Sequence, residues 1–484
     1  MNALKQALNE GRFVCVLEVI PQQSSSHLSA LGQVLQYGRL ANWPLLPSYS
    51  DRVGLRCDMS PLEGAAAFDY PAASLLHFSG KDREGGDLLR QMESMKAHGL
   101  NQLLILSGDR LPGHQPGKAP VRYLESVPAL QLARAHGPDW LLGAALNPFK
   151  YREEDGYAQY LKAQKKLSAG ADFLTLQLGF DATKHLEALT WMRTRPDPKP
   201  MLACVMQLTA RRARALQDVP GIVITDSMRA VLALEQDVSS TCATTRSLER
   251  LALQIVGLQL MGYAGIHLSG LHTLEELLAL ERAIGEQRKH APSMTAWAER
   301  WRASWAIPDA PSISFTPDSG GWRLGQSNVK ASPRERFRYT LLSEVHQRVF
   351  IGQGWFSPAF GWAMTRPLWK NGIAARALHA AERAIKRPLV GCDTCGRCRL
   401  QETLYICPET CPKGLANGPC GGTHLNHCEF GDRECIHSVK YRIAKSAGQL
   451  PLLEQALIPN IDVADRHRSS WPVWFKQDNS SEKR

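Results

Sequence analysis

Short apolar runs alternate with amphipathic stretches from residue 13 to about residue 290. The stretches between the runs, such as residues 87–98 and 157–169, carry their apolar residues at helical spacing. Near-continuous apolar strands separated by helices predict a parallel sheet that is covered on its outside by those helices. The candidate strands are residues 13–19, 52–57 (the weakest), 74–78, 102–107, 140–146, 172–177, 201–206, 221–225 and 263–268.

Nine candidate strands fit an eight-stranded α/β fold, a (β/α)8 TIM barrel, with one strand to spare. An open doubly wound sheet is the alternative, but no G-x-G-x-x-G turn follows any strand, which argues against a Rossmann fold. In a TIM barrel the chemistry lies at the rim where the strands end. Any one polar residue at this rim could simply cap a helix or face solvent. Because polar residues recur at the ends of several strands, they predict a functional site. These residues are Glu18, His77, Asp109, Asn147, Gln177, Asp226 and His267.

The rest of the chain differs from this alternating part. Residues 291–335 contain Pro, Ser and Gly with little periodicity and predict a linker after a barrel domain at 1–290. Residues 336–450 predict a helical and cysteine-rich domain, with helices at 337–350 and 375–386. Residues 451–484 remain as a C-terminal tail.

Length and charge narrow the function classes. The chain has 484 residues, more than one compact domain holds, and 57 Lys and Arg against 46 Asp and Glu give a net charge of +11. This excess suits anionic ligands, acidic partners or nucleic acid. Nucleic acid is disfavoured because aromatic residues are poorly interleaved with the basic ones and the barrel would stay unexplained. No apolar run spans a bilayer and no signal peptide is evident, so we expect a cytoplasmic protein without membrane contact.

Eight of the twelve cysteines lie between Cys392 and Cys435, which indicates a metal site rather than a disulfide framework. A C-x2-C-x2-C run presents three thiolates from one loop and suits a [4Fe–4S] cluster completed by a distant cysteine. Zinc competes, because eight thiolates also make two tetrahedral sites, and His424, His427 or His437 are substitute ligands. We expect the other four, Cys15, Cys57, Cys204 and Cys242, to be buried thiols. The candidate ligands are Cys392, Cys395, Cys398, Cys407, Cys411, Cys420, Cys428 and Cys435.

Six motifs resemble, in order and spacing, those of the methylenetetrahydrofolate reductase family over roughly 270 residues. That family is a (β/α)8 barrel that binds FAD and interconverts methylene- and methyl-tetrahydrofolate. The cysteine-rich stretch at 391–422, which ends in NGPCGG, resembles the C-terminal domain that accompanies some of these reductases. The barrel motifs are LEVIPQ (17–22), HFSGKDR (77–83), LILSGD (104–109), AALNP (144–148), AGADFLTLQLGFD (169–181) and GIHLSG (265–270).

The resemblance implies roles for single residues. Glu18 matches the acid that protonates the leaving nitrogen, a role suited to a shielded carboxyl group. Asp109 matches the aspartate beside the flavin that orients folate, and Gln177 matches the pterin-binding glutamine. Gly179 replaces a larger residue and is expected to enlarge the pocket. The implied FAD contacts are His77, Ser107, Gly108, Asp109, Asn147 and Lys166, with Lys166 a candidate for the FAD phosphates.

The leading hypothesis is therefore a flavin-dependent oxidoreductase acting on tetrahydrofolate-bound one-carbon units, with NAD(P)H as a candidate electron donor. A pterin-dependent methyltransferase, which needs no flavin, and a non-catalytic electron-transfer partner are the alternatives. A redox protein partner and a homo-oligomer stay open. If the cysteines hold iron–sulfur clusters that pass electrons to flavin, their domain should pack against the rim of the barrel and not against its closed bottom.

Overall fold

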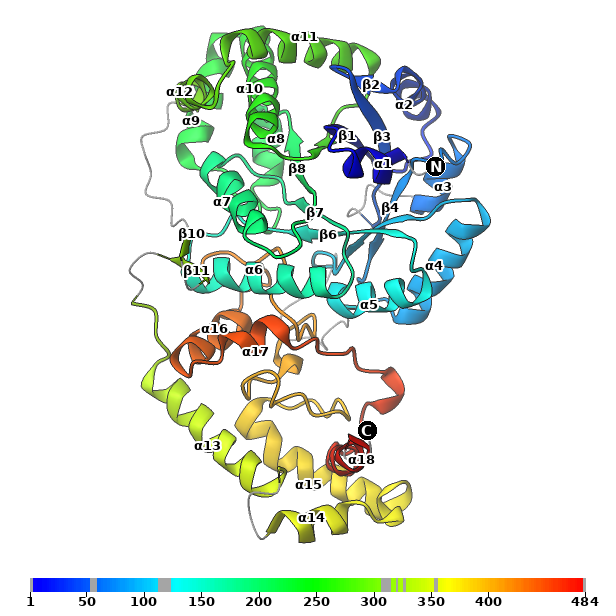
Figure 1. Cartoon of the computed structure of the whole chain (residues 1–484), viewed down its shortest axis with the longest axis vertical. Coiled ribbons are helices and arrows are strands. Elements are labelled where there is room, and N and C mark those ends of the chain that lie inside the picture. Colours follow the sequence, from blue (N-terminus) through cyan, green and yellow to red (C-terminus); the bar gives the residue numbers. More distant parts are fainter. Residues whose placement is uncertain are drawn as a thin grey trace.

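The computed structural model describes residues 3–52, 59–111, 123–305, 315–318, 321–324, 328–351 and 356–481. Eight parallel strands close into a barrel, because β1 pairs with both β3 and β9, and β2 (Arg39–Leu40) adds an antiparallel pairing to β3. The predicted (β/α)8 TIM barrel is confirmed (Figure 1). Its strands are β1 (Val14–Val19), β3 (Trp43–Tyr49), β4 (Leu75–Ser79), β5 (Gln102–Leu106), β6 (Leu141–Leu146), β7 (Phe173–Leu176), β8 (Met201–Met206) and β9 (Gly265–Ser269).

Helices connect the strands and surround the barrel (Figure 1). The helices expected at 87–98 and 157–169 are confirmed as α4 and α6. The barrel helices are α2 (Ser25–Tyr37), α3 (Pro61–Ala66), α4 (Gly85–Ala97), α5 (Ser126–His136), α6 (Glu153–Ser168), α7 (Ala182–Arg193), α8 (Ala210–Leu216), α9 (Asp226–Val238), α10 (Ser240–Met261) and α11 (Leu274–His290).

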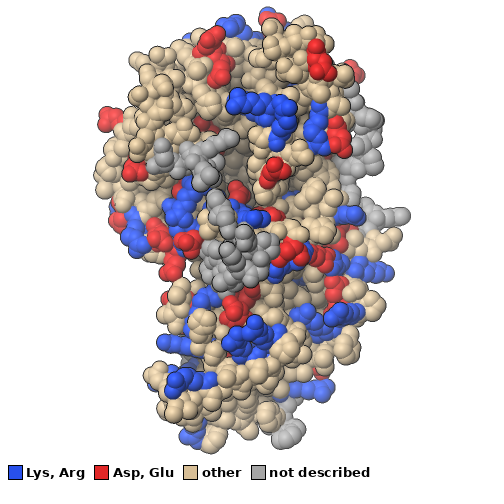
Figure 2. Space-filling model, turned by 180° about the vertical axis from the view of Figure 1, so that it is seen from behind, with Lys and Arg blue, Asp and Glu red and all other residues tan. Residues whose placement is uncertain are grey.

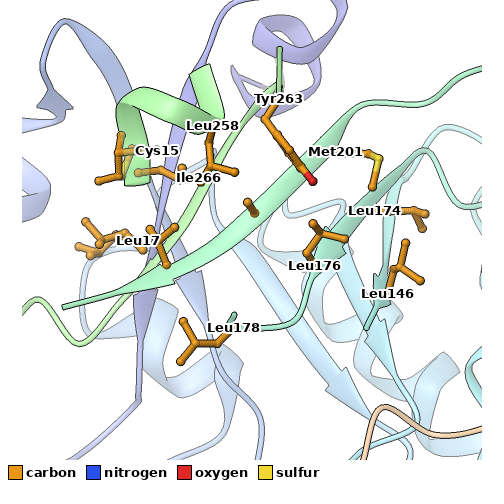
Figure 3. Close-up of a cluster of buried hydrophobic side chains, with 14 of the residues drawn as sticks. Cys15, Leu17, Leu146, Leu174, Leu176, Leu178, Met201, Leu258, Tyr263 and Ile266 are labelled. Atoms are coloured by element: carbon orange, nitrogen blue, oxygen red, sulfur yellow. The ribbon is translucent and has the colours of Figure 1, made fainter. Parts of the chain in front are cut away.

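Two apolar layers make the core of the barrel domain. Side chains that point inward near the strand starts, such as Val14 and Leu202, pack with Leu4 of α1 (Ala3–Asn9), so α1 closes the bottom. Side chains that point outward pack under the helices. Figure 3 shows this second layer, in which Leu17 of β1 and Ile266 of β9 lie in one buried cluster with Leu258 of α10. The polar rim is therefore the remaining end of the barrel.

The structure corrects the strand predictions at two places. The strand β3 was not predicted, because Pro44 and Pro47 lie within it and proline disfavours a strand interior. The run at 221–225 is not a strand but a loop that ends in Thr225, the N-cap of α9. Of the weak candidate at 52–57, Arg52 lies in a loop with positive φ, and residues 53–57 lie outside the described residues.

The cysteine-rich part is also helical. The helices expected at 337–350 and 375–386 are confirmed as α13 and α15. The described elements of this part are the hairpin β10 (Phe315–Asp318) and β11 (Gly321–Leu324), α13 (Pro333–Val349), α14 (Phe356–Met364), η1 (Pro367–Trp369), α15 (Gly372–Val390), η2 (Pro408–Thr410), α16 (Ile436–Ser446), α17 (Leu450–Gln455), η3 (Val463–Asp465) and α18 (Trp471–Ser481).

Two expected boundaries differ from the structure. The range 291–335, expected to be a linker, contains α12 (Met294–Trp305), whose Trp297, Trp301 and Trp305 are buried in the barrel core. The range 451–484, expected to be a tail, contains α18, whose Phe475 packs in a small apolar cluster with α14 and α15. Apolar stripes at helical spacing therefore extend both packed units beyond the predicted limits.

The cysteine-rich domain lies against α6 of the barrel, with α16 and α17 packed on that helix (Figure 1). The segment coloured orange in Figure 1 continues past α6 toward the barrel. Figure 2 shows basic side chains predominating on the visible face of this lower domain. Among the described residues, no helix has the length and apolar character needed to cross a membrane.

Candidate active site at the barrel rim

A carboxylate lies at the end of β1. Glu18 is half-buried, and its Oε1 accepts a hydrogen bond of 2.7 Å from Oγ of Ser50, which follows β3. This partner is a hydroxyl and not a cation. Cys204 on β8, which lies beyond β9 in the barrel, is near Glu18, and burial together with the Glu18 charge raises the pKa of this thiol to about 12. The thiol is therefore neutral.

Two histidines share one hydroxyl below the rim. Oγ of Ser48 lies 2.7 Å from Nε2 of His77 and 3.2 Å from Nε2 of His267, and the ring centroids are 5.7 Å apart. Burial, with a smaller contribution from His267, lowers the pKa of His77 to about 3. Burial also lowers the pKa of His267, against the opposing effect of Glu18. Both rings are therefore neutral, and together with Ser48 they form a polar layer between the apolar bottom and the rim.

The loop after β5 holds three of the predicted residues. Oγ of Ser107 accepts a hydrogen bond of 3.0 Å from the N–H of Ser126, so it supports the start of α5. The carbonyl oxygen of Gly108 accepts one of 2.8 Å from Nζ of Lys413, which belongs to the cysteine-rich domain. Asp109 is exposed, and its carboxylate attracts both Lys413 and the nearby Lys81. Of these three, Asp109 has the side chain most accessible to a ligand.

The glutamine after β7 is half-buried, and its Oε1 accepts a hydrogen bond of 2.9 Å from the N–H of Leu178. Its orientation is thereby fixed, with Gln177 held at the strand end. The expectation that Gly179 enlarges the pocket is wrong. A Cβ added there would lie 2.2 Å from the ring of Phe149, so that ring fills the space.

Two other predicted residues already have partners. Nδ2 of Asn147 donates to the carbonyl oxygens of Gly221 at 2.9 Å and Gly421 at 2.7 Å, and its Oδ1 accepts from the N–H of Phe149. These bonds use both amide hydrogens. Nζ of Lys166 donates to the carbonyl oxygen of Ala145 in β6. Asn147 therefore joins the end of β6 to two other loops, and Lys166 joins α6 to β6.

The last predicted rim residue lies elsewhere. Asp226 follows the run at 221–225 that is not a strand, so it stands in the first turn of α9 and not at a strand end. Its carboxylate is 97% exposed and pairs with Arg229 of the same helix. The expectation that Asp226 belongs to the rim site is wrong, because it depended on the incorrect strand.

The eight clustered cysteines divide into two groups of four. Group I lines a pocket of about 370 Å³, solvent at its mouth included, at the C-terminal end of α15. In group II, the charges of Cys411 and Cys428 help to raise the pKa of Cys420, and those of Cys411 and Cys420 help to raise the pKa of Cys435. These four thiols therefore lie close to one another. Group I is Cys392, Cys395, Cys398 and Cys407, and group II is Cys411, Cys420, Cys428 and Cys435.

The donor set of each group, four thiols with a lysine beside them, suits an anionic metal–thiolate site. Nζ of Lys386 lies 3.5 Å from Sγ of Cys398 in group I, and Lys413 is close to Cys420 in group II. Burial raises the pKa of Cys395 and of Cys428 to about 11, so the free thiols are protonated. Within the part of the chain that the structure describes, no three His, Cys, Asp or Glu side chains are arranged as ligands of one metal ion.

Several functional positions were missed from the sequence. Ser48 lies in β3 and Ser50 follows it, and the sequence did not predict this strand because of its two prolines. Lys413 and Gly421 reach the rim from more than 250 residues away, and no local pattern indicates that contact. The prediction that the cysteine-rich domain packs against the rim and not against the bottom is confirmed by these two hydrogen bonds.

Two family models match the chain. Residues 62–281 match the model described as methylenetetrahydrofolate reductase, and residues 373–464 match the one described as methylene-tetrahydrofolate reductase C terminal. The chain belongs to the methylenetetrahydrofolate reductase family. It combines the reductase barrel with the C-terminal domain in one polypeptide, and its activity is that of a folate-related oxidoreductase of this family.

Solved structures resemble the chain only distantly. An uncharacterised protein from Clostridium thermocellum that binds two copies of 5-methyl-5,6,7,8-tetrahydrofolic acid is 12% identical, with a TM-score of 0.43 over 60% of this chain and 99% of its own. A phosphonopyruvate hydrolase is 14% identical, with a TM-score of 0.32 over 64% of this chain and 91% of its own. These likenesses are too weak to support an assignment. No curated protein matches the sequence.

Proposed function

We propose that the chain interconverts 5,10-methylene-tetrahydrofolate and 5-methyl-tetrahydrofolate at the part of the rim formed by β1, β3, β7 and β9. The observation that carries this proposal is the half-buried Glu18 carboxyl group, which has a hydroxyl partner and the neutral His267 nearby, in a chain of the reductase family. Such a group can deliver a proton inside a shielded site.

The reaction needs one proton at a nitrogen and two electrons at a carbon. Opening the five-membered ring breaks the bond between the methylene carbon and one folate nitrogen, and that nitrogen takes a proton from Glu18. The carbon then belongs to an iminium ion on the other nitrogen. A hydride equivalent, which is two electrons and a proton, converts the iminium to the methyl group. Glu18 recovers its proton from solvent, and the reverse direction uses the same groups.

Two further side chains are suited to holding the pterin. Gln177 offers an amide N–H beside the oxygen that Leu178 fixes, and Asp109 offers an exposed carboxylate. An amide and a carboxylate match the donor and acceptor edge of a pterin.

The family is flavin-dependent, yet the rim residues do not fit FAD in the arrangement that the structure has. Of the implied contacts, Gly108 and Asn147 are hydrogen-bonded to the cysteine-rich domain, and Lys166 is bonded to Ala145. No step is therefore assigned to FAD here. NAD(P)H or a reduced protein partner supplies the two electrons.

We propose that groups I and II each hold one metal centre, either a [4Fe–4S] cluster or zinc. Four thiolates with a cation beside them suit either one. Iron–sulfur clusters would carry electrons to the rim, because Cys420 of group II directly precedes Gly421, which contacts Asn147. Zinc would instead stabilise the fold of the domain.

The pterin-dependent methyltransferase remains the second candidate, and one observation favours it. A methyltransferase needs no flavin, which agrees with the contacts that occupy the implied FAD positions. Against it stands the matched family model, which is that of a reductase. The acceptor of the one-carbon unit distinguishes the two reactions.

Equilibrium binding of 5-methyl-tetrahydrofolate tests the folate site. We expect Asp109→Ala and Gln177→Ala each to weaken binding about tenfold, as the loss of one hydrogen bond to a ligand does. Their thermal unfolding should be unchanged, because rim residues contribute little to the core. Unaltered affinity in both variants would show that folate is held elsewhere.

A further inference from the structure

A buried segment of the cysteine-rich domain covers part of the rim. We name residues 413–423 the rim segment. Its Lys413, Leu415, Ala416 and Thr423 are each about 1% exposed, although the segment has no helix or strand of its own. A loop that is buried so completely must satisfy its polar groups with neighbours, and the neighbours here belong to the barrel.

The start of the rim segment lies at the end of β5. Nζ of Lys413 donates to the carbonyl oxygen of Gly108 at 2.8 Å and forms an ion pair of 2.7 Å with Glu429, whose side chain is fully buried. The same ammonium group lies 5.3 Å from the ring centroid of Tyr123, and the hydroxyl of Tyr123 donates to the carbonyl oxygen of Asp109. The loop after β5 is thus held from two sides.

The end of the rim segment lies over β6. Gly421 offers its carbonyl oxygen to Asn147 at 2.7 Å and to Nζ of Lys150 at 2.9 Å. The fit is close, because a Cβ added to Gly221 would lie 2.1 Å from that oxygen. Gly221 also has a φ of +82°, which disfavours any other residue there.

The middle of the rim segment runs along α6. Nε2 of Gln159 donates to the carbonyl oxygen of Cys420 at 2.8 Å, and Nζ of Lys162 donates to that of Gly418 at 3.0 Å. Backbone carbonyl groups of the rim segment therefore accept hydrogen bonds from polar side chains of α6.

These are the positions that the family resemblance gives to FAD, from the flavin beside Asp109 to the phosphates near α6. The carbonyl oxygen of Gly108 and both amide hydrogens of Asn147 are used by contacts that include the rim segment. A dinucleotide lying along β5, β6 and α6 would need the volume that residues 413–423 fill.

We propose that the rim segment and FAD compete for the same part of the barrel, so that FAD binds at β5 and β6 only when the cysteine-rich domain has moved off the rim. This inference rests on the proposed function, because the resemblance to the reductases supplies the FAD position. The folate side of the rim, at Glu18, is not involved in the competition.

The docked arrangement has its own strong contacts. Glu125 accepts hydrogen bonds from the N–H groups of Ala416 and Asn417 and pairs with Lys162 at 2.8 Å, all of them buried. Burial acts to raise the pKa of Glu125, but Lys162 and these N–H groups lower it to about 2. Further from the rim, the hydroxyl of Tyr441 donates to Glu153 at 2.6 Å. These bonds hold the domain in place against a competing ligand.

Variants that loosen docking without touching an implied FAD contact test the competition. Asn417→Ala removes the amide bond to Glu125 at 3.0 Å, and Tyr441→Phe removes the bond to Glu153. Each loss should shift the docking equilibrium about tenfold, and FAD should bind up to that factor more tightly to the full chain. Arg348→Ala is the control, because this exposed side chain pairs with Glu344 on the same helix.

FAD binding is measured by fluorescence titration, and exchange of amide hydrogens in peptides covering residues 413–423 is measured with and without FAD. We expect tighter FAD binding in both loosened variants, unchanged binding in Arg348→Ala, and faster exchange of the rim segment when FAD is added. Three results would overturn the inference: equal or weaker FAD binding in the loosened variants, no FAD binding in any variant, or slower exchange on addition of FAD.

A parallel titration with 5-methyl-tetrahydrofolate separates the two proposals. If folate binds the wild-type chain while FAD behaves against expectation, the competition alone fails. If folate does not bind, the proposed function fails whatever FAD does.

Discussion

Replacing Glu18 with glutamine removes the proton donor that the proposed reaction requires and leaves its surroundings intact. The 2.7 Å hydrogen bond from Ser50 persists, because the amide oxygen of glutamine accepts it as the carboxylate does. The change in unfolding free energy should therefore stay below about 1 kcal/mol. Turnover should fall about 10²- to 10⁴-fold, the usual cost of losing a general acid.

The assay follows methylene-tetrahydrofolate consumption anaerobically with a reduced viologen dye as donor, and folate affinity is measured separately. Asp226→Asn is the matched control, because Asp226 is an acid that lies on α9 and pairs only with Arg229 among its described neighbours. Glu18→Gln should keep its folate affinity, and Asp226→Asn should keep its activity. Turnover of Glu18→Gln within a few-fold of wild type, or an equal loss in Asp226→Asn, would refute the role of Glu18.

Three further predictions concern the histidine layer, the cysteines and the packing near β7. Burial and His267 lower the pKa of His77 to about 3, whereas the pKa in an unfolded chain is about 6.5. At a pH between these two values, the unfolded chain therefore binds a proton at this residue and the native chain does not. Stability should fall as the pH drops from about 7 toward 3, by about 2 kcal/mol at pH 5 from this residue, and urea titrations of His77→Gln should show a shallower decline. Cys395→Ser and Cys420→Ser should each lower the metal content of the purified chain by half, since they belong to different groups; loss of all metal in either variant would contradict two separate centres. Gly179→Ala should destabilise the chain by about 1–3 kcal/mol because of the ring 2.2 Å away, whereas Gly285→Ala in α11, with nothing within 4 Å, should be neutral or stabilising in thermal unfolding.

Much of the barrel could be predicted because each strand carries its own apolar run. The exceptions have local causes. In β3 two prolines hide a strand whose last residues pair with β1, and in 221–225 a short apolar run packs as a loop before the Thr225 cap. Periodicity over five residues does not distinguish these cases.

The site was predictable only where it lies at strand ends. Glu18 and Gln177 follow directly from the strand pattern and the family motifs. The neutral histidine pair depends on Ser48 of the hidden strand, and the contacts of residues 413–423 join parts of the chain that are far apart in sequence. Such contacts come from docking of two folded units, which no local pattern in either unit encodes.

The fate of a labelled carbon tests the proposed reaction most directly. The full chain, purified and kept anaerobic, is given tetrahydrofolate with a carbon-13 methylene bridge and a reduced dye, and carbon NMR follows the label. We predict that the label appears in the methyl group of 5-methyl-tetrahydrofolate and that this conversion is lost in Glu18→Gln. Label that stays in the methylene bridge, or methyl label that is passed from 5-methyl-tetrahydrofolate to an added thiol or corrinoid without any electron donor, would contradict the oxidoreductase assignment.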